Sequence, residues 1–452
     1  MQLLGIVVRT VATGVLLAAG LTTSVYAQST LADLVRSAKE FDPMYRAAMA
    51  AAQASEQELA GAESLIGPRV TLSSSAFKTE RTEESTNFLG KTLQTDRQFN
   101  SRLTQIQARQ PIYRHRDHVS IDQAQARKEA AQQALLAAEQ DLHFRLLESW
   151  VDVLSSRELV LVYTQAVAAA EEQATEAERR RKAGETGVQD LEQARARLVQ
   201  AQAMLLESRA TLDIANQEFR HIAGPKAHVP EGFTIADLRA FQRTALNEQQ
   251  LSDAVDAKNP EILSARHQED AARFERDKAK ADYFPTLEAY VSASRGDNDT
   301  NSSIKDEQRI GVQFSMPLYT HGAIGAAVAQ ADANFRRAQA QTHSTTLKIR
   351  LEAISSQTLV RVLETRMSAA DRSAEATRLS LRAAQMGVKA GVSSRSEVAQ
   401  ALQEFLGAQR QRVTVRKDYF MAWLRLQKAL AALEEPAVVQ YEQAFRLAAT
   451  KQ

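Results

Sequence analysis

The chain has no cysteine among its 452 residues, and it is poor in proline and aromatic side chains. Without cysteine it cannot form disulfide bonds, thiolate chemistry, cysteine-ligated zinc or a lipid-modified N-terminal cysteine. Only 9 prolines and 6% aromatic residues, together with abundant alanine, favour long helices over a layered enzyme with an aromatic core. The composition therefore indicates long helices without disulfide bonds.

The chain also lacks a strong charge bias and recognisable catalytic motifs. Its formal net charge of +1 gives no electrostatic reason to expect nucleic acid as a partner. No phosphate-binding glycine loop, nucleophile elbow or paired-metal signature occurs, so we predict no enzyme activity and no cofactor. Beyond the N-terminus no window reaches about 18 consecutive apolar residues, so strands would have to carry any part of the mature chain that enters a membrane.

The first 27 residues have the pattern of a secretory signal peptide. Arg9 supplies a positive charge, Val11 to Leu21 is apolar, and Ala27 is the small residue that signal peptidase requires. We predict cleavage before Gln28. A short membrane anchor is the alternative, although the apolar run is short for a span of about 20 residues.

Two turns that contain glycine, around Gly184 and Gly391, organise the rest of the chain. Each ends a stretch without glycine or proline, at 112–183 and 326–386. As helices, stretches of about 70 and 60 residues would reach roughly 100 and 90 Å, too long for one compact domain. The first also carries leucines at coiled-coil spacing. The turns lie 207 positions apart, which indicates a duplicated unit.

Four segments alternate apolar and polar residues in the manner of strands, at about 69–77, 99–110, 286–295 and 308–316. In the second segment the apolar positions change parity between Leu103 and Ile106, which predicts a β-bulge there. The polar stretches between paired strands, 78–98 and 295–306, are predicted to be solvated loops.

The predicted elements repeat in the order helix, strand, loop, strand, long helix, turn, helix. Asp42-Pro43 and Gly67-Pro68 have counterparts 217 positions later, and Gln110-Pro111-Ile112-Tyr113 has one in Met316-Pro317-Leu318-Tyr319. We predict a signal peptide at 1–27 and a first repeat at 28–224, with one helix over 30–66 and long helices at 112–183 and 188–223. A connector at 225–250 leads to a second repeat at 251–435, with long helices at 325–388 and 394–433. A tail follows at 436–452.

Four amphipathic strands cannot close a membrane barrel within one chain, because even small barrels use about eight. Open edges are not tolerated in lipid, so several chains would have to share one barrel, and three copies would supply twelve strands. The apolar strand faces would meet lipid and the polar faces would line a lumen. The charged long helices would project into water and pack side by side, which yields a tube that continues a pore.

The secretion signal, the duplicated strand pairs, the Met316-Pro317-Leu318-Tyr319-Thr320-His321-Gly322 segment before an alanine-rich helix and the Ala390-Gly391 turn resemble TolC-type outer-membrane factors. The resemblance covers essentially the whole mature chain. It implies a mainly α protein with membrane β structure: a homotrimer with a twelve-stranded outer-membrane β-barrel, four strands per chain, on a long periplasmic α-helical barrel. It also implies two partners, a periplasmic adaptor (membrane fusion) protein and an inner-membrane ABC or other transporter.

Three functions remain open at this point. The Asp42-Pro43 and Asn259-Pro260 helix starts and the missing lipid-acceptor cysteine resemble family members that serve type I protein secretion, so an exit duct for secretion is the main prediction. A multidrug efflux channel is the alternative within the same architecture. A soluble periplasmic coiled-coil scaffold or adaptor would also suit the long helices, but it has no use for paired segments of membrane length.

The resemblance points to a gate at the periplasmic tip, where the family has acidic residues after the second glycine turn. The matching positions are Glu397, which keeps the acid, and Gln400, which has lost the charge. Three copies of Glu397 around an axis would form an anionic constriction. In the first half, Asp190 could meet a basic residue such as Arg395 across an interface, although the family's usual arginine would fall at Ser393.

A structural interpretation competes at each of these positions. Ser394 with Glu397, and Thr186 with Gln189, have capping-box spacing and could serve only to satisfy backbone donors at the helix starts. Asp190 could be a favourable acid in the first turn of a helix. Near the end of the first long helix, Glu176 with Arg180 and Glu178 with Lys182 are spaced as i,i+4 ion pairs, which favours a solvated helix end over a docking patch.

His115 and His118 with Asp117 raise a metal hypothesis, because a three-residue spacing can place two imidazoles on one helical face. No other histidine, cysteine or acidic cluster completes such a site. We therefore predict surface histidines at a helix start and no bound metal.

Overall fold

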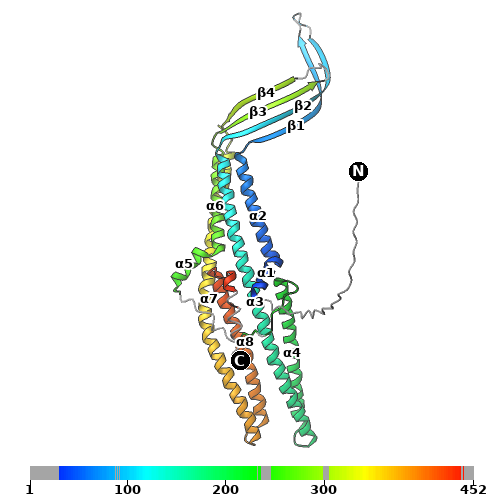
Figure 1. The fold of residues 1–452 in the computed structure, drawn as a ribbon, viewed down its shortest axis with the longest axis vertical. Helices are drawn as coiled ribbons and strands as arrows, with labels where there is room; N and C mark the ends of the chain where they lie inside the picture. Colours follow the sequence, from blue (N-terminus) through cyan, green and yellow to red (C-terminus); the bar gives the residue numbers. More distant parts are fainter. Residues whose placement is uncertain are drawn as a thin grey trace, which may run out of the picture.

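The computed structural model describes residues 30–438 and 441, apart from residues 87, 89, 91, 232, 236–245 and 299–304. The expected signal peptide and most of the expected tail lie outside the described residues. Figure 1 shows an elongated molecule with the sheet at one end and the tips of two helical hairpins at the other. The two ends are joined by helices that run along the long axis.

One antiparallel sheet holds all four strands in the order β1-β2-β3-β4. The strands are β1 (Arg69–Thr86), β2 (Thr92–Arg114), β3 (Thr286–Asn298) and β4 (Lys305–Ser315). β1 and β2 continue through most of 78–98, so the prediction of a solvated loop there was wrong. Ladder hydrogen bonds need no side-chain pattern, so an exposed ribbon can consist of polar residues on both faces.

The bulge predicted between Leu103 and Ile106 was also wrong, because the β1–β2 and β2–β3 registers are unbroken there. The register shifts instead between Pro111 and Tyr113. Proline has no N–H to donate to a ladder, which explains why the irregularity falls at this position.

One face of the sheet is apolar and exposed. Val70, Ala108, Val291 and Ile310 form one row across the four strands. In the single chain the side chain of Ile310 is 85% exposed and that of Val291 is 52% exposed. Apolar surface of this extent on a sheet marks contact with lipid or protein. The outer edges of β1 and β4 have no strand partner within the described chain.

The first helical segment is broken into α1 (Leu31–Phe41) and α2 (Pro43–Glu63), which corrects the prediction of one helix over 30–66. Asp42 ends α1 and caps α2, accepting the N–H of Tyr45 at 2.8 Å, and Pro43 takes the first helical position, where it needs no donor. A short 3₁₀ turn, η1 (Ser64–Ile66), leads to the sheet.

The remaining helices are α3 (His115–Lys182), α4 (Val188–Ala223), α5 (Glu248–Lys258), α6 (Pro260–Ala281), α7 (Ala323–Lys389) and α8 (Arg395–Ala429). Residues 112–114, expected in the first long helix, belong to β2. α3 with α4 and α7 with α8 form two hairpins, and α3 also packs on α2, α6 and α8 (Figure 1). Among the described helices none combines the length and apolar character needed to cross a membrane.

The main core lies where α1, α3, α4, α8 and the segment after α4 meet. The fully buried indole of Trp150 contacts the rings of Phe219 and Phe233 at centroid distances of 6.0 and 5.3 Å. Arg157 of α3 donates to the carbonyl oxygens of Val229 and Pro230 at 2.6 and 2.9 Å, which ties this segment to the helices. Each large apolar side chain buried here contributes about 1.5–3 kcal/mol.

Asp42 also anchors α2 to α3. Arg145 Nη1 and Nη2 donate to its two carboxylate oxygens at 2.7 and 3.1 Å, and the Asp42 side chain is buried. Burial raises the pKa of Asp42, but the hydrogen bonds from Arg145 and from the Tyr45 N–H outweigh it and leave the pKa lowered. In the second repeat Asn259 takes this place, capping α6 through the Glu261 N–H at 3.0 Å and donating to Ala429 O at 3.0 Å.

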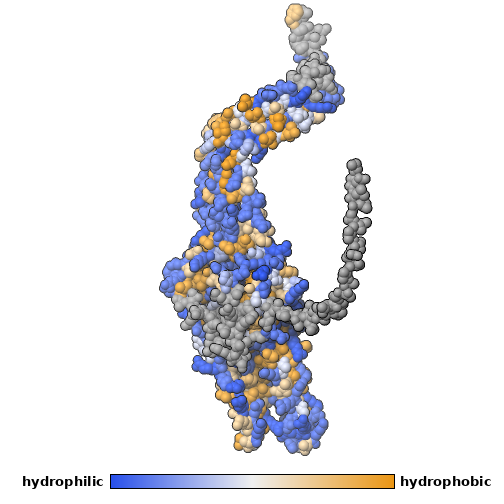
Figure 2. Space-filling view, in the orientation of Figure 1, coloured by the Kyte–Doolittle hydropathy of each residue, from blue (hydrophilic) through white to orange (hydrophobic). Residues whose placement is uncertain are grey.

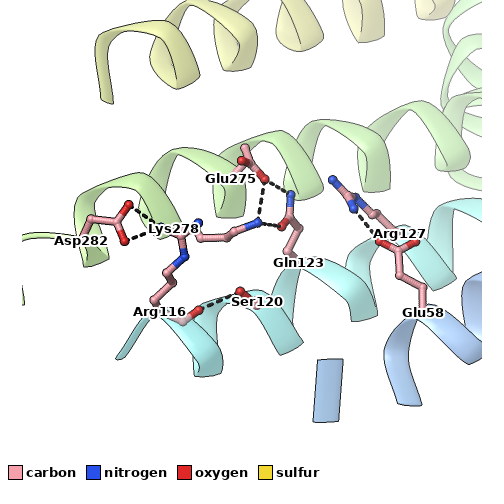
Figure 3. A network of polar contacts seen from close by, with 8 residues as sticks. All are labelled: Glu58, Arg116, Ser120, Gln123, Arg127, Glu275, Lys278 and Asp282. Carbon is pink, nitrogen blue, oxygen red and sulfur yellow. Dashed lines mark hydrogen bonds and ion pairs between the residues drawn. The ribbon is translucent and has the colours of Figure 1, made fainter. Parts of the chain in front are cut away.

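Below the sheet, a polar network joins α2, α3 and α6 (Figure 3). Gln123 of α3 donates to Glu275 of α6, and Lys278 Nζ lies 3.1 Å from Gln123 Oε1 and 3.3 Å from Glu275 Oε2. Arg116 binds Asp282 on one side, and Arg127 binds Glu58 of α2 on the other. These charge-assisted hydrogen bonds hold the three helices together along the N-terminal part of α3, from Arg116 to Arg127.

Candidate site at the periplasmic tip

The two hairpin tips have the same backbone geometry. Gly184 and Gly391 have φ values of 76° and 75°, in the left-handed region that glycine enters without steric cost. The Glu185 N–H donates to the carbonyl oxygen of Arg180, five residues earlier, at 2.9 Å. In the same way the Val392 N–H donates to the carbonyl oxygen of Gly387 at 2.9 Å. This pattern is the Schellman ending of a helix. The glycines therefore close both long helices in the same way.

The helix starts after the two turns differ. Ser394 is the N-cap of α8, and its hydroxyl accepts the Glu397 N–H at 3.2 Å. At α4 the N-cap is Gly187 and no side chain caps the helix, so the prediction of a capping box from Thr186 to Gln189 was wrong. Thr186 lies one residue too early for that role, and its buried hydroxyl has no hydrogen-bond partner among the described residues. Asp190 takes the third helical position, where its charge suits the helix dipole.

A groove of about 1080 Å³ separates the two tips, and residues of α3, α4, α7 and α8 line it. Figure 2 shows the tips as two separate lobes, with hydrophilic residues dominating the α3–α4 lobe. Four of the residues singled out from the sequence line this groove: Thr186, Asp190, Ser394 and Arg395. Gln189, Glu397 and Gln400 are exposed outside it.

An ion pair crosses the groove within the chain. Arg395 Nη1 at the start of α8 lies 2.5 Å from Glu176 Oε1 of α3, with 54% and 32% of the two side chains exposed. Asp190 lines the same groove but forms no ion pair among the described residues, so its contact with Arg395 of another chain stays a prediction. Spacing along the sequence paired Glu176 with Arg180 on the same helix and did not identify it as a partner of Arg395.

Arg180 pairs with Glu185 at 3.2 Å instead of with Glu176. The expected pair of Glu178 with Lys182 is present at 3.1 Å, and the Lys182 hydrogen bond lowers the pKa of Glu178. Carboxylates of α3 and of the turn that follows it thus pair with Arg179, Arg180 and Lys182.

Glu397 and Gln400 both point to solvent from the first turns of α8. Gln400 Nε2 donates to Glu404 Oε1 at 3.1 Å along the same helix. The Glu397 carboxylate has no ion-pair partner within the described part of the chain. It is therefore available to a neighbouring molecule.

The histidine pair does not gain metal ligands from the fold. The ring of His115 packs against Phe284 at a centroid distance of 5.0 Å. Asp117 is buried and lies 3.6 Å from Arg114. Within the described residues no group of three or more histidine, cysteine, aspartate or glutamate side chains is placed to hold a metal ion.

An open four-stranded sheet with an exposed apolar face, carried on two long helical hairpins, defines a subunit of the outer-membrane channels that have a helical periplasmic part. The family model of the outer membrane efflux protein matches residues 34–225 and 251–432. The chain belongs to this family. It is accordingly an outer-membrane protein with a large periplasmic helical portion.

Individual relatives agree with this assignment. The chain is 26% identical over 360 residues to the proteases secretion protein PrtF of Dickeya chrysanthemi, covering 78% of each chain. It is 25% identical over 414 residues to the alkaline protease secretion protein AprF of Pseudomonas aeruginosa, covering 88% of this chain and 83% of AprF. The CmeC outer membrane channel of Campylobacter jejuni has the same fold, with a TM-score of 0.79 at 15% identity over 91% of this chain and 89% of CmeC.

Proposed function

We propose that three copies of this protein form the outer-membrane exit duct of a type I protein-secretion system. The duct receives its cargo from an inner-membrane transporter through a periplasmic adaptor protein and carries it to the outside. It is a passive conduit, so it needs no catalytic residue and no cofactor.

The observation that carries this proposal is the unclosed sheet. Within the described part of the chain β1 and β4 each have one unpaired edge, and an apolar sheet in lipid cannot leave backbone donors and acceptors open. Four strands are too few to close on themselves, whereas three copies supply twelve. Polar residues such as Gln107, Ser292 and Gln313 occupy the face opposite the apolar one and would line the lumen.

The helices support the same assembly. Each hairpin exposes large apolar side chains that the single chain leaves uncovered, such as Leu206 on α4 and Leu351 on α7, at 71% and 67% exposure. Neighbouring hairpins in a closed ring would cover them. The helical ring would then continue the barrel lumen into the periplasm.

Protein secretion is favoured over drug efflux by the relatives. PrtF and AprF are both named for the secretion of proteases, and each aligns with more than three quarters of this chain. A multidrug efflux channel is the second candidate, because the family itself is described by efflux.

The gate of the duct would lie at the tip. The Arg395–Glu176 ion pair holds the α7–α8 hairpin against α3 in each copy, and opening would require the two hairpins to move apart. Glu397 and Gln400 of the three copies would ring the constriction, with Glu397 supplying its negative charge.

Two experiments test the proposal. Light scattering of the mature protein, extracted from the outer-membrane fraction, should give three chains once detergent is subtracted; a monomer that stays soluble without detergent would leave a periplasmic scaffold as the better account. Deletion of the gene in its own bacterium should remove specific proteins from the culture medium. Unchanged secretion with increased drug sensitivity would instead establish the efflux alternative.

A further inference from the structure

The duplicated sequence determines more than the number of strands. Inside the chain, the two repeats meet where β2 pairs with β3. In the proposed trimer, which this inference takes as its basis, they meet a second time where β4 of one copy pairs with β1 of the next. If the repeats are equivalent strand by strand, the first junction gives the residue register of the second.

The equivalence can be checked on a pairing that the structure contains. Gly67-Pro68 before β1 and Phe284-Pro285 before β3 are 217 positions apart, whereas Gln110-Pro111 and Met316-Pro317 are 206 positions apart. With these two offsets, the β1–β2 pair Arg69–Arg109 becomes Thr286–Ser315.

Thr286 and Ser315 are indeed opposite one another in the β3–β4 ladder. The pair Phe77–Ser101 likewise becomes Ser294–Glu307, which is also present. The offsets therefore hold along the whole length of the second hairpin.

The same offsets, applied to the β2–β3 junction, predict the β4–β1 junction between neighbouring copies. Gln107 of β2 corresponds to Gln313 of β4, and Ser292 of β3 corresponds to Ser75 of β1. Gln107 lies opposite Ser292. We propose that Gln313 of one copy lies opposite Ser75 of the next copy, and that this register runs along the whole β4–β1 junction.

The register keeps the apolar residues of the two strands on one face. It places Val312 opposite Ala76 and Phe314 opposite Ser74, and these positions belong to the exposed apolar face of the sheet. A slip by one residue would place the apolar side chains of β1 on the opposite face of the sheet from those of β4.

The register also sets how much of β1 is covered by a partner strand. β1 has 18 residues and β4 has 11. In this register β4, Lys305 to Ser315, lies opposite Glu83 to Ser73 of the next copy, so the 11 residues of β4 cover the central 11 of the 18 residues of β1. The central part of this long edge strand is thereby protected from open pairing.

On the lumen face, the register sets two aromatic rings beside a glycine. Gly311 lies opposite Tyr290 in its own chain, where a Cβ atom on the glycine would come within 2.9 Å of the tyrosine hydroxyl oxygen. In the next copy Gly311 lies opposite Phe77, whose side chain is 50% exposed in the single chain. The missing side chain leaves room for both rings.

Disulfide trapping in full-length protein tests the register, because the chain has no cysteine of its own. Residues directly opposite in an antiparallel pair have Cα atoms about 4.5–5.5 Å apart, whereas diagonal neighbours are about 7–8 Å apart, beyond the usual reach of a disulfide. The in-register variants are S75C/Q313C and S73C/S315C. The matched controls recombine the same four substitutions out of register, as S75C/S315C and S73C/Q313C.

Both in-register pairs should give covalent dimers and trimers on non-reducing gels after mild oxidation, about tenfold more than the controls. A further pair, S74C/F314C, samples the other of the two alternating hydrogen-bonding positions of the ladder. Equal or stronger cross-linking in the controls, or no cross-linking by any in-register pair in a protein that light scattering shows to be trimeric, overturns the register and leaves the duct in place. A wild-type protein that is monomeric in detergent overturns the proposed function and the register together.

Discussion

Removing the ion pair between Arg395 and Glu176 should raise the open probability of the duct. At 2.5 Å between Arg395 Nη1 and Glu176 Oε1, with half of the arginine side chain exposed, the pair belongs to the partly solvated class that contributes up to about 1 kcal/mol. Three copies act together at the tip, so Arg395→Ala should destabilise the closed state by about 1–3 kcal/mol per trimer. This corresponds to roughly a 5- to 150-fold increase in the ratio of open to closed channels.

Single-channel recording in planar bilayers measures this ratio directly. The effect of Arg395→Ala should shrink as salt is raised, because the Debye length falls from about 10 Å at 0.1 M to about 3 Å at 1 M. Arg410→Ala on the same helix is the matched control, since Arg410 is exposed and has no ion pair among the described residues. An Arg395→Glu, Glu176→Arg double variant should restore closure.

Two results would refute the reasoning. One is an open probability of Arg395→Ala equal to that of the wild type at low salt. The other is a charge-reversed double variant that stays as open as either single variant, since this would mean that the pair does not act as a unit.

Three further predictions concern stability. Asp42→Ala removes the cap of α2 and the carboxylate that Arg145 binds, so it should lower the free energy of unfolding by about 3 kcal/mol. Asp42→Asn keeps a cap and should lower the free energy of unfolding by less. Thermal melts followed by circular dichroism compare the two variants. Because the pKa of Asp42 is lowered on folding, its stabilisation is complete above the unfolded value of about 3.9 and is lost as the pH falls through the folded value, so the advantage of wild type over Asp42→Asn should vanish in acid. Ser394→Ala should weaken the start of α8 by about 1 kcal/mol while Thr186→Ala leaves α4 unchanged, and hydrogen exchange of the first helical turns would contradict this if both responded alike. Trp150→Ala should cost about 3–5 kcal/mol by opening a cavity in the core, and a melt within experimental error of wild type would show that the core does not depend on this ring.

The long helices and the duplication were predictable because both are local patterns. Freedom from glycine and proline over 112–183 and 326–386 matches α3 and α7 to within a few residues, and Gly184 and Gly391 end them as expected. Strand alternation located all four strands where one face is apolar. It failed over 78–98, because a ribbon exposed on both faces carries no alternation to detect.

At the tip, the sequence identified which residues start the helices but not which of them meet. Capping by Ser394 depends on a spacing of three residues, which can be read along the chain. The Arg395–Glu176 pair joins positions more than two hundred residues apart, and only the packing of α8 against α3 brings them together.

By itself the sequence determined that the chain is a duplicated unit of long helices and membrane-length strands, because helix length, strand alternation and repeat spacing follow from each residue and its near neighbours. The tertiary structure decided the strand order and the partner of Arg395. These depend on which distant segments pack together, and that is a property of the whole chain.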